Sequence, residues 1–273
     1  MDRREFLASC AAAAALPRLV ATPPARIDRV GLQLYTIRSE MEASVERTLF
    51  EVARVGYKEV EFAGYFGRPP RAIKQLLDRN DLRSPSAHVS IGTLRSGWFG
   101  TLYNASEMGQ KWLVVPSLPP SDRDSLDAIK RTAELLNTAA LDAKTYKIRV
   151  AYHNHDVEFQ EIEGRRILDV LLAETDPELV DFELDLYWTV KGGADPLEYF
   201  RRHPGRFPLV HVKDSTGAPE HQMTEVGKGT IDFAAIYAAR RVAGIKHWFV
   251  EHDNPADPMA SIRTSFRYLD ALD

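Results

Sequence analysis

This chain has little cysteine and no excess of positive charge. Its only cysteine is Cys10, so no disulfide can form within the chain and stability must come from a packed core. The 35 basic residues are outnumbered by 39 acidic ones, which gives a formal net charge of −4. With a pI near 6.1, a mainly electrostatic grip on nucleic acid or anionic lipid is not expected. A small neutral or mildly anionic ligand fits this charge balance better.

Apolar runs long enough to span a bilayer are also missing, and the most apolar segment lies at the N-terminus. Arg3 and Arg4 precede an alanine-rich stretch that reaches Leu16. A basic start, an apolar core of roughly 10 residues and a small-residue exit are typical of a secretory signal peptide, and the paired arginines resemble a twin-arginine signal. The residues before Cys10 also look like a lipoprotein cleavage box, but that box precedes most of the apolar stretch, which disfavours lipidation.

We therefore predict that residues 1–25 are a signal peptide and that residues 26–273 form the mature chain. The protein is expected in the periplasm or otherwise outside the cytoplasm, without stable membrane insertion.

The mature chain repeats one unit, a short apolar or β-branched run followed by a stretch with helical periodicity. Eight strands are expected: VGLQLYT from Val30, KEVEFAG from Lys58, SPSAHVS from Ser84, KWLVVPS from Lys111, IRVAYHNHD from Ile148, VDFELDLYW from Val180, PLVHVKD from Pro208 and HWFVEHD from His247. Helices are expected over residues 43–56, 69–80, 101–109, 125–146, 166–175, 196–203, 230–244 and 258–272. Gly56, Asn80 and Gly244 are expected helix ends with positive φ.

Strand and helix alternation at this spacing predicts parallel strands joined by right-handed crossovers. Eight such units close into a (β/α)8 TIM barrel, and 273 residues with 44% hydrophobic content suffice for one such domain. A doubly wound open sheet is the alternative. It is less favoured because no glycine-rich phosphate turn follows the first strand.

In a barrel of this kind the chemistry sits where strands end, and the strand ends here are rich in metal-competent side chains. They comprise Gln33, Tyr35, Glu61, His88, His153, His155 with nearby Glu158, Asp185, Trp188, His211, Lys213, Asp214, Glu251 and His252. One buried histidine would be unremarkable. Several converging carboxylates, however, would repel one another and lose hydration, and a cation is the usual remedy.

We predict one divalent metal ion, with His153, Asp185, His211 and Glu251 as ligands. The strand period of two places His153 and His155 on one face, pointing inward together. Nitrogen and oxygen donors without thiolate indicate Mn²⁺, Co²⁺, Mg²⁺, Fe²⁺ or Zn²⁺, and the oxygen-rich set favours Mn²⁺. Such an ion would polarise a sugar carbonyl or hydroxyl and ease removal of a neighbouring C–H proton.

The motifs GLQLYTIR, GYKEVEFAG, AYHNHDVEF, ELDLYW, LVHVKD, EVGKGTIDF and FVEHD, in this order, resemble the sugar phosphate isomerase/epimerase family of xylose-isomerase-like barrels. In ketose 3-epimerases of that family a Glu, an Asp, a His and a Glu on strands five to eight hold the metal. Asp185, His211 and Glu251 match the last three in type and position. The chain departs from the pattern on strand five, where His153 stands in place of glutamate.

The resemblance implies acid/base roles for the strand-five and strand-eight glutamates, and one of this pair is absent here. His153 remains a candidate ligand, while His155 or Glu158 would supply the second proton-transfer group. Glu158 is open between metal ligand, substrate hydrogen-bond acceptor and simple helix-flank charge. The expected catalytic residues are therefore Glu251, His155, Glu158 and Lys213. The expected substrate-binding residues are Gln33, Tyr35, His88, Trp188 and Lys228.

The favoured function is a metal-dependent sugar isomerase or epimerase that acts through an enediolate on an unphosphorylated sugar or keto-sugar. A 3-keto-glycoside lyase or hydratase at the same site is the near alternative. An apurinic-site endonuclease shares the barrel but would need a basic surface. A non-catalytic periplasmic sugar-binding protein would not need the His/Asp/Glu set. The expected partner is a small sugar or keto-sugar rather than nucleic acid, and the oligomeric state is open.

Overall fold

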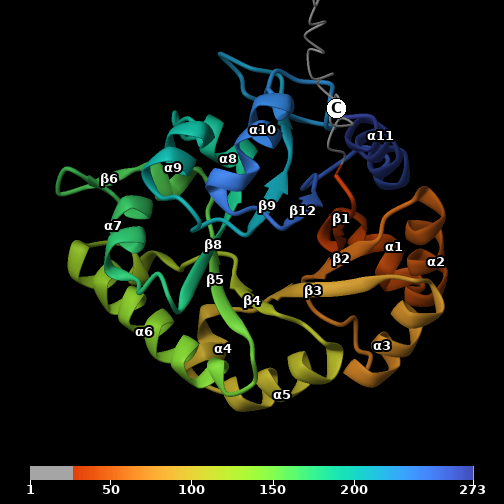
Figure 1. Cartoon of the computed structure of the whole chain (residues 1–273), viewed down its shortest axis with the longest axis horizontal. Coiled ribbons are helices and arrows are strands. Elements are labelled where there is room, and N and C mark those ends of the chain that lie inside the picture. Colours follow the sequence, from red (N-terminus) through yellow and green to blue (C-terminus); the bar gives the residue numbers. More distant parts are fainter. Residues whose placement is uncertain (1–26, 273) are drawn as a thin grey trace, which may run out of the picture.

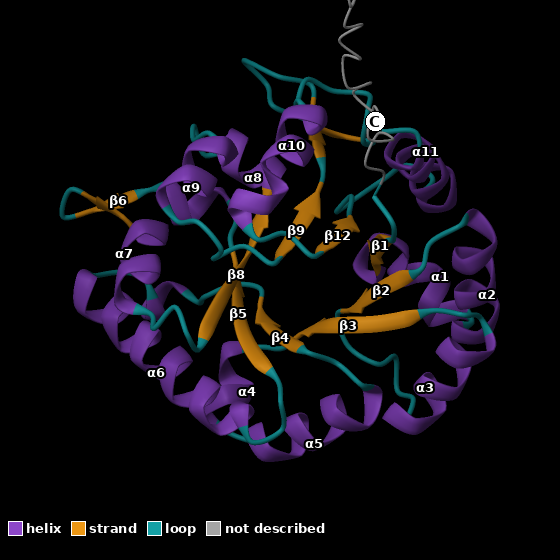
Figure 2. Cartoon of the chain, viewed as in Figure 1, coloured by secondary structure: helices purple, strands orange, loops and turns teal. Residues whose placement is uncertain are grey.

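The computed structural model describes residues 27–272 and shows a closed barrel of eight parallel strands. Around the barrel the strands follow the order β1-β12-β9-β8-β5-β4-β3-β2. Their bounds are β1 Val30–Gln33, β2 Glu59–Phe62, β3 Arg83–His88, β4 Trp112–Val115, β5 Arg149–His153, β8 Val180–Asp185, β9 Leu209–Val212 and β12 His247–Val250. Helices enclose the strands in an outer ring (Figures 1 and 2). The predicted (β/α)8 barrel and all eight of its strands are confirmed. The predicted signal peptide, with Arg3, Arg4 and Cys10, lies outside the described residues.

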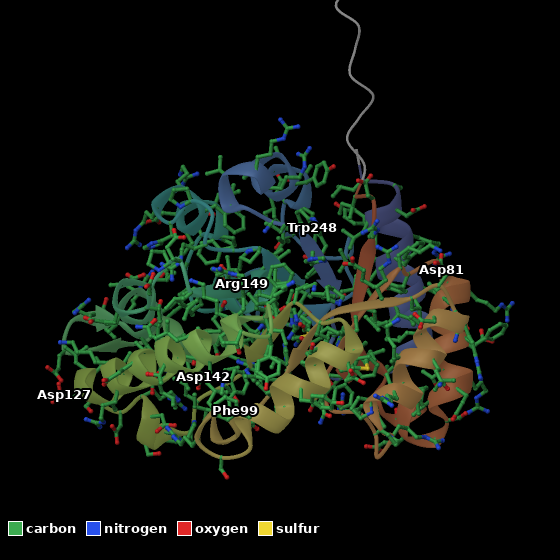
Figure 3. All side chains as sticks on the ribbon, turned by 60° about the horizontal axis from the view of Figure 1, so that its bottom comes forward. Asp81, Phe99, Asp127, Asp142, Arg149 and Trp248 are labelled. Atoms are coloured by element: carbon green, nitrogen blue, oxygen red, sulfur yellow. The ribbon has the colours of Figure 1, made fainter. Side chains whose placement is uncertain are left out.

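The helices connect successive strands and pack their apolar faces on the barrel. They are α1 Arg38–Ala43, α2 Val45–Val55, α3 Pro70–Arg79, α4 Ile91–Arg95, α5 Trp98–Met108, α6 Leu126–Lys144, α7 Ile167–Glu174, α8 Leu186–Lys191, α9 Pro196–Arg202, α10 Phe233–Ala243 and α11 Pro258–Asp270. Short 3-10 helices occur at η1 Leu34–Ile37, η2 Pro120–Asp122 and η3 Asp156–Phe159. Two small hairpins are formed by β6 Glu161–Ile162 with β7 Arg165–Arg166, and by β10 Asp214–Ser215 with β11 Met223–Thr224. Polar and some aromatic side chains face outward, as Asp127 and Phe99 do at the periphery (Figure 3).

Polar side-chain contacts close the end of the barrel where the strands begin. The Asp181 carboxylate accepts hydrogen bonds from Trp112 Nε1 at 2.8 Å and from the Arg149 guanidinium, and His247 Nδ1 lies 2.6 Å from Glu59 Oε2. Active sites of TIM barrels lie at the opposite end, where the strands finish.

Several predicted boundaries are wrong for local reasons. The strand expected through Trp188 ends at Asp185, because the Asp185 side chain caps α8 by accepting a hydrogen bond from the Trp188 N–H at 2.9 Å. Helix α5 begins at Trp98 rather than Thr101. Gly56 and Gly244 have positive φ as expected, but Asn80 has φ −104°.

Within residues 27–272, no helix is both long enough and apolar enough to cross a membrane.

Candidate active site

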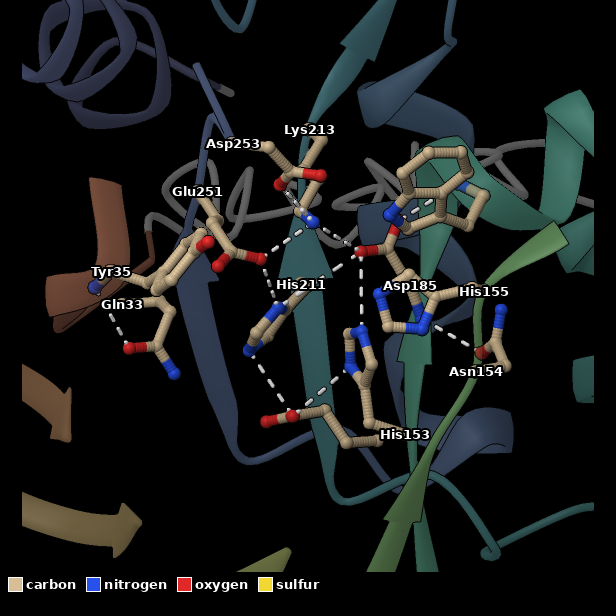
Figure 4. Close-up of polar contacts among 12 residues, drawn as sticks. Gln33, Tyr35, His153, Asn154, His155, Asp185, His211, Lys213, Glu251 and Asp253 are labelled. Atoms are coloured by element: carbon tan, nitrogen blue, oxygen red, sulfur yellow. Dashed lines mark hydrogen bonds and ion pairs between the residues drawn. The ribbon is translucent and has the colours of Figure 1, made fainter. Parts of the chain in front are cut away.

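Parallel register brings the polar side chains together at the C-terminal ends of β5, β8, β9 and β12. His153 pairs with Glu183 across β5 and β8, and Asp185 pairs with His211 across β8 and β9. Glu251 follows the last residue of β12 directly. Asn154 fixes the strand end because its Oδ1 accepts a hydrogen bond from the Asp185 N–H at 3.0 Å. The four strands therefore deliver their side chains to one point (Figure 4).

The upper part of this cluster contains Asp185, His211, Glu251 and Lys213. His211 Nδ1 lies 2.8 Å from Glu251 Oε2 and 4.0 Å from Asp185 Oδ2. The Lys213 ammonium lies 3.1 Å from Asp185 Oδ2, 2.6 Å from Glu251 Oε2 and 2.7 Å from Asp253 Oδ1. Asp185 Oδ2 is buried and has no partner in hydrogen-bonding geometry, although Lys213 is close to it. Three carboxylates thus converge around one ammonium group.

The deeper part is built around one carboxylate oxygen of Glu183. Nitrogen atoms of His88, His153 and His211 lie 2.9, 3.2 and 3.1 Å from Glu183 Oε2. Glu61 Oε2 adds a second carboxylate, 2.7 Å from His211 Nε2. All five side chains are largely or fully buried. The deeper part is therefore a buried network of imidazoles and carboxylates.

Burial and neighbouring charges set the protonation states in the deeper network. Burial opposes protonation of His88, but Glu61 and Glu183 raise its pKa to about 9. Burial and Glu61 oppose ionisation of Glu183, yet His211 and His153 lower its pKa to about 2. Burial, together with the positive charge of His211, lowers the pKa of His153 well below its usual value. His153 is therefore a neutral imidazole, the form in which histidine binds metal.

In the upper part the pKa values of Asp185 and Lys213 are both raised, but for different reasons. Burial raises the pKa of Asp185 to about 6, although Lys213 and His211 lower it. Burial opposes the charge of Lys213, but Asp185, Glu251 and Asp253 raise its pKa well above its usual value. Lys213 therefore stays positively charged.

A cavity of about 1090 Å³ opens onto these side chains. Some of the predicted substrate-binding residues line this cavity and others do not. Tyr35, His88, His153, His155, Lys213 and Glu251 line it. Gln33 does not line it; its Nε2 donates to Glu61 Oε2 at 2.7 Å and so holds that carboxylate in place. Trp188 does not line it either; the centre of its ring lies 5.4 Å from that of the His155 ring and 5.7 Å from Lys213 Nζ.

Glu158 and Lys228 lie apart from the cluster. The two oxygens of Glu158 accept hydrogen bonds from the Tyr152 hydroxyl and the His155 N–H, both at 2.7 Å, so its carboxylate shapes η3. Lys228 is exposed and does not line the cavity. This geometry does not support the expected proton-transfer role of Glu158 or the expected ligand contact of Lys228.

The loop that carries Lys228 is pinned by one carboxylate. Asp214 is buried, and its two oxygens accept hydrogen bonds from the N–H groups of Ser215, Gly227, Gly229 and Ile231 at 2.8 to 3.1 Å. A Cβ at Gly229 would lie 2.2 Å from the Ser215 carbonyl oxygen. Only glycine fits there, and the loop is held against the barrel.

The sequence predicts no role for three residues of the cluster, Glu183, Glu61 and Asp253. Glu183 shares a strand face with Asp185 at a spacing of two, and that signal was available. The spacing alone does not single it out, because buried parallel strands are usually apolar on both faces. Glu61 was noted only as a strand-end residue, and Asp253 lies beyond the last strand, where periodicity gives no guidance.

The donor atoms suit a divalent metal ion. One ligand atom each from Asp185, His211 and Glu251 lie within 4.8 Å of one another, as do those of His88, His153, Glu183 and His211. Both sets combine imidazole nitrogen with carboxylate oxygen and contain no thiolate, which suits Mn²⁺, Zn²⁺ and similar ions. Both sets contain buried atoms without a hydrogen-bond partner: Asp185 Oδ2 in the first, and Glu183 Oε1 and His153 Nδ1 in the second. His153 Nε2 lies 3.7 Å from Asp185 Oδ2 and can join the first set.

Residues 49–272 match the family described as "Xylose isomerase-like TIM barrel". The chain belongs to this family. The inosose dehydratase of Lacticaseibacillus casei is 25% identical over 280 aligned positions, which cover 84% of this chain and 90% of that protein.

Solved structures give the same result for the fold. The crystal structure of a sugar phosphate isomerase/epimerase from Parabacteroides distasonis ATCC 8503 superposes with a TM-score of 0.80 at 27% identity, covering 92% of this chain and 96% of that one. The crystal structure of the IOLI protein with a bound zinc atom has a TM-score of 0.72 at 14% identity, with coverage of 88% and 95%. The xylose-isomerase-like barrel predicted from the motifs is therefore confirmed, and the chain is an enzyme of this family.

Proposed function

We propose that this xylose-isomerase-like barrel is a metal-dependent lyase that removes a proton beside the ketone of an unphosphorylated keto-sugar or keto-polyol and then expels a β-leaving group. The observation that carries the proposal is that two groups with opposite pKa shifts line the same cavity: His155, whose pKa is lowered by burial, and Lys213, whose pKa is raised by three carboxylates. Two groups whose environments push their pKa values apart are typical of an acid/base site. The name of the dehydratase relative, a lyase type of enzyme, supports elimination over the epimerisation favoured from the motifs alone.

In this proposal Asp185, His211, Glu251 and His153 hold the metal ion, with Mn²⁺ as the favoured ion and Zn²⁺, as in the IOLI structure, as the alternative. A divalent ion bound there would polarise the substrate carbonyl and make the neighbouring C–H bond more acidic. Asn154 and the α8 cap hold Asp185 in place for this purpose.

His155 is the proposed base. Burial and the nearby Lys213 lower its pKa to about 4, so the imidazole is neutral at pH 7 and has a free lone pair for the proton, which the metal-polarised carbonyl makes more acidic. The imidazolium formed can return that proton to the departing oxygen, which restores the free base. Lys213 remains protonated and stabilises the negative charge that develops on the substrate oxygen.

The proposal is tested by incubating metal-loaded protein with an inosose, a 3-keto-glucoside and a free ketose in deuterated water. We expect loss of the β-substituent from the first or second compound, with an unsaturated ketone as product. Inversion of the free ketose with deuterium at the α-carbon, and no elimination from either other compound, would instead support the epimerase. If no compound exchanges a C–H proton with any of Mn²⁺, Co²⁺, Mg²⁺, Fe²⁺ or Zn²⁺, the proposal is wrong and a binding protein becomes the better hypothesis.

A further inference from the structure

The cavity has a charged half and a neutral half. The ionisable groups that line it are His88, His153, His155, Lys213, Glu251 and Asp253. His153 ends β5, and the last four follow β5, β9 or β12. The other lining residues that follow β2, β3 and β4 or belong to α4 and α5 carry no charge, and they include Tyr65, Ser90, Thr93, Asn104, Ser117 and Leu118. Strands β2, β3 and β4 are neighbours in the barrel and lie across from β9 and β12 (Figure 1).

Hydrogen-bonding groups in the neutral half are available to a ligand. The Asn104 amide and the Ser117 hydroxyl make no hydrogen bond to any other side chain or backbone group within residues 27–272. The hydroxyls of Ser90 and Thr93 bond to each other at 3.0 Å, and each retains further capacity. Leu118, between two prolines in the β4–η2 loop, adds an apolar wall. Hydroxyls, an amide and apolar surface are what an uncharged, hydroxylated ligand requires.

The cavity is large enough for more than one ring. Small-molecule sites that bury a drug-sized ligand span roughly 300–1,000 Å³, and this cavity has about 1090 Å³. A single six-membered keto-ring engaged by His155 and Lys213 would leave the half over β2, β3 and β4 unfilled.

We propose that the neutral half is a subsite for an uncharged leaving group, a second sugar ring or an aglycone, attached to the keto-ring. This inference rests on the proposed elimination and narrows its substrate class to 3-keto-glycosides. A phosphorylated leaving group is not accommodated, because no lysine, arginine or histidine lines this half apart from His88 at its border.

The reaction balances without an added oxidant or reductant. The base takes the proton from C2, next to the C3 ketone. The C2–H electron pair becomes the C1=C2 double bond as the C1–O bond breaks, and the departing alcohol receives the proton. The products are an unsaturated keto-sugar and the free alcohol, which the neutral half holds before release.

The subsite is tested with Asn104→Phe, which places a large side chain into the neutral half from an exposed helix position. Wild type and variant are compared by kcat/KM for 3-keto-cellobiose and for methyl 3-keto-glucoside. The ratio of the two values removes any general effect on the protein. We expect this ratio to fall roughly tenfold in Asn104→Phe, the scale of a few lost pocket contacts. Ser106→Ala, on the same helix α5 but outside the cavity lining, should keep the wild-type ratio.

An unchanged ratio in Asn104→Phe, with the fold verified by circular dichroism, overturns the subsite. If wild type eliminates from neither compound, the proposed function fails, and the subsite is judged separately by calorimetry with cellobiose and glucose. Tighter binding of cellobiose than of glucose, lost in Asn104→Phe, supports the subsite. Equal affinity for the two sugars overturns it.

Discussion

Asp185→Asn separates metal binding from folding, because the asparagine keeps the shape and the helix cap of Asp185 but not its charge. The amide oxygen can still accept the Trp188 N–H that Asp185 accepts at 2.9 Å. Residue 185 is fully buried, and burial raises the pKa of its carboxyl to about 6, so a neutral side chain there is tolerated without metal. The unfolding free energy should therefore change little.

Metal affinity should fall steeply in the same variant. Removing partners that only orient a ligand typically costs about 10–100-fold in metal affinity. Loss of a direct ligand should exceed about 100-fold, or about 2.7 kcal/mol. Equilibrium dialysis with elemental analysis measures the dissociation constant for Mn²⁺ and Zn²⁺, and calorimetry follows unfolding.

Asp181→Asn is the matched control, since Asp181 lies on the same strand at the opposite end of the barrel. The change removes a buried carboxylate that accepts hydrogen bonds from Trp112 and Arg149. It should therefore destabilise the fold by about 2 kcal/mol and leave the metal affinity unchanged. An Asp185→Asn protein that binds metal in stoichiometric amounts with the affinity of wild type would refute the ligand assignment.

Three further predictions concern pH, the pinned loop and export. In metal-free protein the raised pKa of His88, about 9, gives stability that is complete below about pH 6.5 and is lost as the pH rises through 9. Urea unfolding across this range should show a loss on the order of 3 kcal/mol in wild type and a flatter profile in His88→Asn. Gly229→Ala should lower the unfolding free energy by about 2 kcal/mol or more, because its Cβ would lie 2.2 Å from a carbonyl oxygen and 2.4 Å from Asp214 Oδ1; an unchanged melting temperature would contradict the pinned loop. We also propose export by the twin-arginine route: changing Arg3 and Arg4 to lysine should retain the precursor in the cytoplasm, and unchanged export, followed by cell fractionation, would rule that route out.

The barrel could be predicted because its signal is repeated eight times, so no single ambiguous segment decides the fold. Helices α1, α4 and α8 could not, since each has five or six residues and shows too little of a 3.6-residue period. The β6–β7 hairpin is polar and short, and no alternation marks it.

The site was predictable in type but less so in detail. Reading strand ends found Asp185, His211 and Glu251 because parallel strands all deliver their last residues to one rim. His155 reaches the cavity as expected but for another reason: β5 ends at His153, so His155 is placed by the turn into η3 rather than by strand alternation. The charge of Lys213 depends on three carboxylates from other strands, which no single segment of sequence reveals.

The Asp214 carboxylate has a consequence for how the molecule moves. Four amides from a segment of 17 residues share its two oxygens, so no one of these bonds can open without weakening the support of the others. The segment should open to solvent as one cooperative unit, and its four amides should exchange their hydrogens at a common rate. Any closure over a ligand then falls to the other loops at the mouth of the barrel.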